Sequence, residues 1–217
     1  MKNKKDLLKK VLESFKTTIV LMVICGLVFP LCLTLIGQVI FPSQANGNVV
    51  EANGEAVGAK YVGQEFNEPY FMKGRPSAVH YNTYFEDEEG NKTYSDGSEF
   101  TGLASGSNNY GPSNPALVER VEADKEAFLA ANPEVKEEDI PTDLLTASGS
   151  GLDPHISVAS AELQIPAIAE ASGIDEATLK TIVENNTTHK LFGIFGEETV
   201  NVLGVNVEIY EMMNGTK

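Results

Sequence analysis

A serine, an aspartate and a histidine lie close together in residues 146–157, which read Thr-Ala-Ser-Gly-Ser-Gly-Leu-Asp-Pro-His-Ile-Ser. A hydroxyl, an imidazole and a carboxylate are the groups that nucleophilic hydrolases use. Ser150 or Ser148 with His155 would therefore suit a membrane-anchored extracellular hydrolase. The nucleophile elbow, however, reads Gly-x-Ser-x-Gly. Ser148 and Leu152 occupy the outer positions around Ser150, so the motif is absent, and a triad drawn from one short stretch would be unusual.

The same glycine-rich stretch could instead bind phosphate through a nest of backbone N–H groups. The candidate nucleotide-binding residues there are Ser148, Gly149, Ser150 and Gly151. A P-loop also needs a lysine after its last glycine, and no lysine lies between Lys136 and Lys180. The sequence therefore favours a third interpretation, a structural turn. In it the glycines allow a tight path, Asp153 and Pro154 turn the chain, His155 bonds across the turn and Ser157 caps a helix.

Arg75 is one of only two arginines in the chain and lies in the loop Gly74-Arg75-Pro76-Ser77. A guanidinium in such a loop is suited to holding carboxylates or backbone carbonyls with two N–H groups, and an ordinary salt bridge is the alternative. His80 and His189 have no partner ligands at metal-binding spacing. We therefore predict no metal site and no tightly bound cofactor.

The first 41 residues have the pattern of a membrane anchor. Residues 1–16 contain six lysines against two acidic residues, and residues 17–41 are uncharged and mostly apolar. A helix of that length spans a bilayer of about 30 Å. A cleaved signal peptide would have a shorter apolar core and an Ala-x-Ala site. The lysines predict a cytoplasmic N-terminus and place residues 42–217 as one extracytoplasmic domain, in a single-pass protein of the cell membrane.

Within the predicted span, Thr18, Cys25 and Cys32 recur every seven residues. Small or soft side chains on one helix face favour packing against other membrane helices. Pro30 predicts a kink in the helix. Both features favour a segment that belongs to a larger membrane complex.

The outer domain is strongly acidic. Residues 42–217 hold 10 basic and 29 acidic residues, a net charge of −19. Nucleic acid is excluded as a partner, because phosphate binding needs a basic surface. The charge serves solubility, or it enriches cations close to the surface.

The pattern of caps and breakers predicts an α+β domain with one small sheet and several short helices. Asn114 and Pro115 begin a helix that ends near Ala131. The other predicted elements are a strand within 57–66, a loop over 86–109, helices over 158–164, 166–173 and 176–184, and a bulged strand over 200–210.

Short motifs along almost the whole chain resemble the KdpC family, the C subunit of the ATP-driven high-affinity potassium importer of bacteria. The matching stretches are Gly37-Gln38, Phe41-Pro42, Gln44-Ala45-Asn46-Gly47, Val62-Gly63-Gln64, Tyr70-Phe71, Gly74-Arg75-Pro76-Ser77-Ala78, Ser105-Gly106-Ser107-Asn108, Gly111-Pro112-Ser113-Asn114-Pro115, residues 145–157, Gln164-Ile165-Pro166, Val200-Asn201-Val202-Leu203 and Asn206. Two features depart from the family pattern: the acidic insert at 86–103 is longer, and Ala167 stands where a basic residue is common.

The resemblance implies a non-catalytic accessory subunit. Its partners would be a channel-like potassium-binding subunit, a P-type ATPase subunit and a very small membrane subunit. The family is described as a catalytic chaperone that raises the ATP affinity of the ATPase subunit, here through residues 148–151 and Gln164. The lysine asymmetry conflicts with that role, because it places these residues outside the cell; ATP would then act only through the ATPase subunit.

Overall fold

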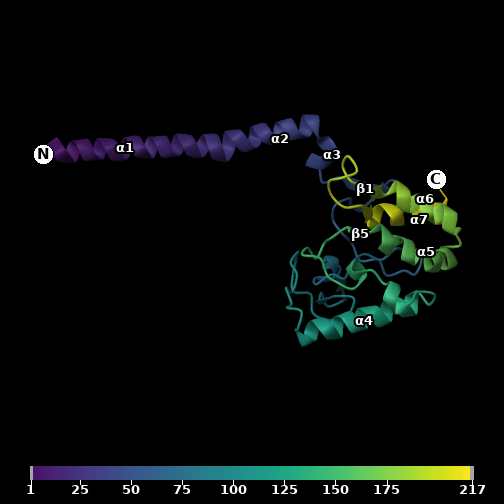
Figure 1. Ribbon diagram of the computed structural model, residues 1–217. Helices are drawn as coiled ribbons and strands as arrows, with labels where there is room; N and C mark the ends of the chain where they lie inside the picture. The colour runs from purple at the N-terminus through teal and green to yellow at the C-terminus, as the bar shows by residue number, and fades with distance from the viewer. Residues whose placement is uncertain (1, 216–217) are drawn as a thin grey trace. The chain divides into compact units, whose positions relative to one another are not determined.

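The chain folds into two compact units that divide between Asn48 and Val49. The computed structural model describes residues 2–215. The first unit is helical, and the second is an α+β domain (Figure 1). The predicted fold class is therefore confirmed.

The first unit is one long helix followed by a short one. Helix α1 (Lys2–Val23), the π-helical turn η1 (Ile24–Val28) and helix α2 (Phe29–Ile40) run without a break, and α3 (Pro42–Ala45) follows. The 37 residues Lys4–Ile40 are long and apolar enough to cross a membrane. The helix therefore fits a membrane anchor.

The π-helical turn η1 accommodates Pro30, which follows it closely in the long helix. Proline has no N–H, so Pro30 cannot bond the carbonyl of Gly26, and its ring crowds that carbonyl. The Phe29 N–H instead reaches back five residues to the carbonyl of Ile24. A π turn contains an extra residue and rotates everything after it about the helix axis. Cys32 is therefore offset from the line through Thr18 and Cys25 that an uninterrupted α-helix would give.

The core of the second unit surrounds a three-stranded antiparallel sheet of order β5-β7-β6. Its strands are β5 (His155–Ser157), β7 (Thr199–Asn201) and β6 (Thr187–Thr188). Helices α5 (Val158–Ser172), α6 (Glu176–Asn185) and α7 (Val202–Asn214) gather around it, whereas α4 (Pro115–Ala131) lies along another side of the domain (Figure 1). The buried apolar side chains come mainly from these elements: Met72, Ile156, Ala161, Ile165, Ile168, Leu179, Ile182, Val183, Val200, Val202, Val205 and Ile209.

The rest of the second unit has little regular structure. Strands β1 (Val49–Ala52) and β2 (Glu55–Ala59) form a hairpin, and β3 (Phe85–Glu86) pairs with β4 (Lys92–Thr93). The short 3-10 turns are η2 (His80–Asn82), η3 (Glu137–Asp139) and η4 (Thr142–Leu144). Backbone groups between β2 and α4 must therefore find partners outside ladders and helices.

Three of the four predicted helix starts are confirmed, and the one at Pro166 is not. The side chain of Asn114 accepts from the Ala116 N–H at 3.0 Å, and Pro115 is the first helical residue. Ser157 accepts from the Ser160 N–H at 3.1 Å. Asp175 likewise accepts from Thr178 at 2.9 Å and begins α6.

The prediction of a bulged strand over 200–210 is wrong, because only the first two of these residues are in a strand and the others form α7. The side chain of Asn201 accepts from the Gly204 N–H at 2.9 Å and caps the helix. Val202, Val205 and Ile209 are buried together on one face. This buried set has helical spacing, whereas the apolar residues at 200 and 202 and at 203, 205, 207 and 209 also alternate, which is why the sequence suggested a strand.

Two further boundaries differ from the predictions. Helix α5 continues through Pro166 to Ser172, although we predicted a break there. Pro166 and Glu162 lie on the exposed face, where water can satisfy the carbonyl that the proline leaves free. The strand predicted within 57–66 is β2, which ends at Ala59, and the loop predicted over 86–109 contains part of the β3–β4 hairpin.

Candidate functional site

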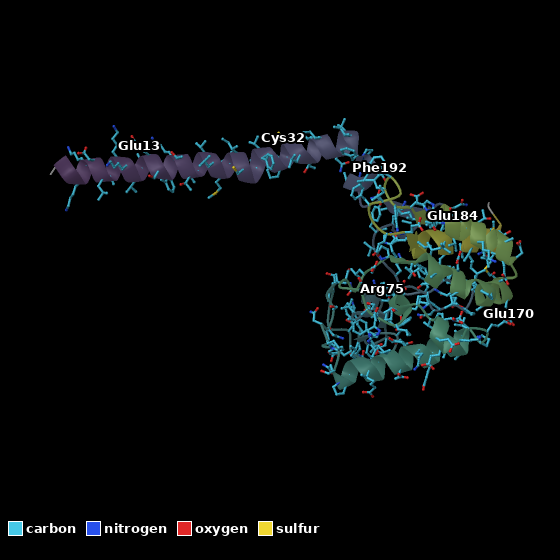
Figure 2. The ribbon with its side chains drawn as sticks, viewed as in Figure 1. Glu13, Cys32, Arg75, Glu170, Glu184 and Phe192 are labelled. Carbon is cyan, nitrogen blue, oxygen red and sulfur yellow. The ribbon has the colours of Figure 1, made fainter. Side chains whose placement is uncertain are left out.

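Arg75 lies where three segments of the second unit meet: residues 63–81, 105–106 and 146–155. We call this region the motif junction. Its Nε and Nη2 donate to the carbonyl of Thr146 at 3.3 and 3.1 Å. Its Nη1 lies 3.6 Å from a carboxylate oxygen of Asp153. Figure 2 shows Arg75 within the second unit, surrounded by other side chains. The expectation that Arg75 holds a carbonyl with two N–H groups is therefore confirmed.

Ser77 and Tyr81 complete one side of the junction. The hydroxyl of Ser77 donates to the carbonyl of Gly151 at 2.7 Å and accepts from the N–H of Tyr81 at 3.0 Å. The Tyr81 hydroxyl donates to the carbonyl of Arg75 at 2.7 Å. Burial, reinforced by the charge of Asp153, raises the pKa of Tyr81 to about 12, so its proton stays in place. These bonds hold three consecutive residues, 80–82, in the left-handed region at φ of 47°, 53° and 58°, a conformation that costs energy in non-glycine residues.

Backbone N–H groups in and next to the Ser/Gly stretch, residues 148–151, already form hydrogen bonds within the domain. The N–H of Gly151 donates to the carbonyl of Ser105 at 2.9 Å. The N–H groups of Ser150 and Leu152 donate to the hydroxyls of Ser148 and Ser150, at 3.3 and 3.2 Å. Three N–H groups that a phosphate cradle would need are therefore already used. The geometry gives the cradle no support.

The hydrolase alternative also lacks the required geometry. His155 donates its backbone N–H to Asp153 at 3.1 Å, as expected for the turn, and its Nε2 lies 3.5 Å from the amide of Asn201. Among residues 2–215, no hydrogen bond joins His155 to Ser148 or Ser150. In the same part of the chain, no group of three or more metal-binding side chains could hold an ion.

Two buried amide side chains hold the segment that precedes Arg75. Gln164 accepts from the Lys73 N–H at 2.8 Å and donates to the Lys73 carbonyl at 3.2 Å. Asn206 does the same for Met72, at 2.7 and 2.9 Å. Gln164 is 3% exposed and Asn206 2%. Each amide bonds both backbone polar groups of one residue, as a neighbouring strand would. The amide oxygen and nitrogen of Gln164 are therefore both engaged and leave no group free to bind a nucleotide in this structure.

A family pattern covers most of the chain. The family described as K+-transporting ATPase, c chain, matches residues 11–211. The chain belongs to the KdpC family.

Similar proteins cover this KdpC-family chain almost from end to end. A potassium-transporting ATPase KdpC subunit of Clostridium kluyveri is 56% identical over 201 residues, which cover 93% of both chains. One from Clostridioides difficile is 54% identical, covering 95% of this chain and 99% of the relative. One from Caldanaerobacter subterraneus is 39% identical, covering 94% and 95%.

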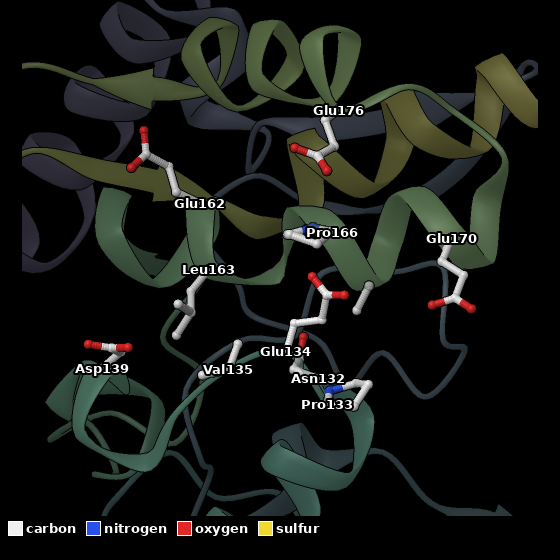
Figure 3. A pocket seen from close by; sticks show the side chains of 11 residues that line it. Asn132, Pro133, Glu134, Val135, Asp139, Glu162, Leu163, Pro166, Glu170 and Glu176 are labelled. Carbon is white, nitrogen blue, oxygen red and sulfur yellow. The ribbon is translucent and has the colours of Figure 1, made fainter.

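A cavity that the sequence did not predict lies between the C-terminal end of α4 and helix α5. Its volume is about 430 Å³. Leu163, Pro166 and Ala167 form part of its apolar lining, and Figure 3 shows the carboxylates of Glu134, Glu162 and Glu170 around it. Among residues 2–215, no lysine or arginine lines it. Ala167 adds no basic group, so every charged side chain described in the lining is acidic.

Two histidines outside the anchor have shifted pKa values. Burial, which outweighs the nearby Asp153, lowers the pKa of His155. A hydrogen bond to Glu198, together with Glu184, raises the pKa of His189. The stabilisation from His189 is therefore present below its unfolded pKa of about 6.5 and is lost as the pH rises through the raised value. For His155 the sign is opposite, because stability is lost as the pH falls through its lowered pKa.

Proposed function

We propose that this KdpC-family chain is a non-catalytic accessory and assembly subunit of a potassium-transporting ATPase. The partners would be a channel-like potassium-binding subunit, a P-type ATPase subunit and a small membrane subunit. Residues 17–41 would cross the membrane, residues 1–16 would stay in the cytoplasm, and residues 42–217 would form the extracytoplasmic domain. Support comes from the family match, the apolar helix Lys4–Ile40 and the lysines that precede it.

One observation supports an accessory role more than a catalytic one: the polar side chains of the motifs form hydrogen bonds with backbone groups of the domain itself. Arg75 and Ser77 bind carbonyls, Gln164 binds both polar groups of Lys73, and Asn114 caps a helix. Catalytic groups, by contrast, must be free to reach a reacting atom. The motifs build a rigid domain that suits docking on partner subunits. A direct ATP-binding role has little geometric support, because Gln164 is buried and bonded.

The anchor provides the test of assembly. Replacing residues 17–41 with an unrelated apolar span of equal length is expected to remove most of the potassium-binding subunit that co-purifies in detergent. The reason is that packing between membrane helices depends on specific small side chains. The double variant Cys25→Ala, Cys32→Ala is the matched control and is expected to co-purify normally, because it keeps small side chains. Normal co-purification of the replaced span would contradict the proposal.

A single cysteine tests on which side the domain lies. In a chain with Cys25→Ala and Cys32→Ala, Ser150→Cys is expected to react with a membrane-impermeant maleimide in intact cells, because residue 150 is exposed. Lys4→Cys, in the lysine-rich segment, is the control and is expected to react only after lysis. Protection of residue 150 until lysis would place the domain in the cytoplasm and restore the case for nucleotide binding.

A further inference from the structure

The loop between β6 and β7 exposes an unusual cluster of large apolar side chains. We define the apolar tip as residues 191–195, Leu-Phe-Gly-Ile-Phe. Its four large side chains are 63%, 84%, 75% and 65% exposed in sequence order. Figure 2 labels Phe192 in this loop, outside the packed helices of the second unit. Isolated exposed apolar residues are common, but a contiguous cluster of this kind usually marks a binding surface.

The apolar tip is a fixed structure. The N–H of Leu191 donates to the carbonyl of Phe195 at 2.8 Å, and the reverse bond is 3.0 Å. Between them Phe192 and Gly193 adopt the left-handed conformation at φ of 55° and 72°. At the base of the loop the ring of His189 lies 3.3 Å from Glu184 and 3.2 Å from Glu198. The apolar side chains are therefore presented with little ordering left to do on binding.

The short connection between the two units limits how far the second unit can lie from a bilayer. If the long helix crosses the membrane, its apolar part ends at Ile40, and the second unit begins at Val49. The eight residues between them can span at most about 28 Å, even fully extended. A domain of this size has a radius of gyration of about 15 Å. The near side of the domain therefore lies within about 28 Å of the bilayer surface, and a loop on that side meets the bilayer at a high effective concentration.

The charge around the tip decides which kind of surface it fits. Residues 42–217 carry a net charge of −19. Lys190 directly precedes the tip, but Glu184, Glu197 and Glu198 lie beside the loop or its base and outnumber it. Anionic headgroups would be repelled. Apolar and aromatic side chains partition without charge attraction into the boundary between headgroups and acyl chains.

We propose that the apolar tip inserts into the neutral interfacial layer of the same bilayer that the N-terminal helix crosses. The domain would then touch the membrane at a second point, which fixes its orientation for docking on partner subunits. The inference rests on the membrane anchor of the proposed function. It adds a lipid contact by the domain itself, at Phe192 and its neighbours.

The test uses the full chain with Cys25→Ala and Cys32→Ala, reconstituted in phosphatidylcholine vesicles. A bimane probe is attached at Phe192→Cys, and in a second protein at Ile194→Cys. Leu103→Cys is the matched control, because Leu103 is a large apolar residue that is also strongly exposed, at 82%, but lies outside the apolar tip. Nitroxide-bearing lipids are expected to quench the probes at 192 and 194 several-fold more than the probe at 103, and aqueous iodide is expected to show the reverse order. Anionic lipid is expected to weaken the lipid quenching.

Equal quenching by iodide at all three positions, in chains that float with the vesicles, would overturn the inference and leave the anchor intact. Shielding that arises only when the other ATPase subunits are present would also overturn it, since a protein would then cover the tip. Failure of the full chain to float with vesicles would overturn both the anchor and the inference.

Discussion

Asn206→Asp is expected to lower the free energy of unfolding of the second unit by about 4 kcal/mol at neutral pH. The amide of Asn206 donates to the Met72 carbonyl at 2.9 Å and is 2% exposed. A carboxylate would still accept from the Met72 N–H, but it would leave the carbonyl without a donor and place a buried charge beside it. A loss of that size is a large part of the stability of a typical domain. Urea denaturation of the detergent-solubilised chain measures it as a lower midpoint at constant slope.

Asn214→Asp is the matched control for that change. Asn214 ends the same helix and is exposed, and within residues 2–215 its side chain bonds the carbonyl of Tyr210 alone. The control adds the same charge and is expected to change stability by less than about 0.5 kcal/mol. Equal effects of the two substitutions would mean that Asn206 does not hold the segment around Met72.

Gly63→Ala is expected to cost about 2–3 kcal/mol, because the added methyl group has no space. A Cβ on Gly63 would lie 2.5 Å from the carbonyl oxygen of Asp153 and 2.5 Å from the ring of Tyr81. The Gly63 N–H also donates to the carbonyl of Leu152 at 2.9 Å, so the two backbones cannot separate without losing that bond. The same urea experiment measures the loss.

Gly149→Ala controls for the general effect of replacing a glycine. A Cβ on Gly149 would meet nothing within 4 Å. Reduced freedom of the unfolded chain is then expected to leave stability unchanged or raise it by up to about 1 kcal/mol. A larger loss from Gly149→Ala than from Gly63→Ala would contradict the packing described for the motif junction.

The helix starts were predictable from sequence because their causes are local. A cap such as Asn114 or Asp175 acts on an N–H two or three residues away. The apolar helix was predictable for the same reason, since its length and lack of charge are continuous in sequence. The final element was predicted wrongly because its apolar spacing fits both periods. The choice of helix was made by the cap at Asn201 and by burial of one face against the core.

The candidate site was predictable only in part. The two-N–H contact of Arg75 with a carbonyl followed from its loop and its chemistry, but the carbonyl, that of Thr146, lies 71 residues away. Sequence alone gave no sign that Gln164 and Asn206 take over the backbone bonds of a missing strand. The apolar tip had a readable signal: the run Leu-Phe-Gly-Ile-Phe between polar residues combines a turn glycine with side chains that rarely stay in water.

The long separation of the amide clamps has a consequence for how a ribosome makes this protein. The bonds between Met72 and Asn206 cannot form until 134 further residues have been synthesised. The middle strand of the sheet, β7, is also the last of its three strands to be synthesised. The residues that complete the core of the second unit are therefore among the last to be synthesised. A chain released early keeps its long apolar helix but lacks Asn206 and β7, so the core of its second unit stays open and accessible to proteases.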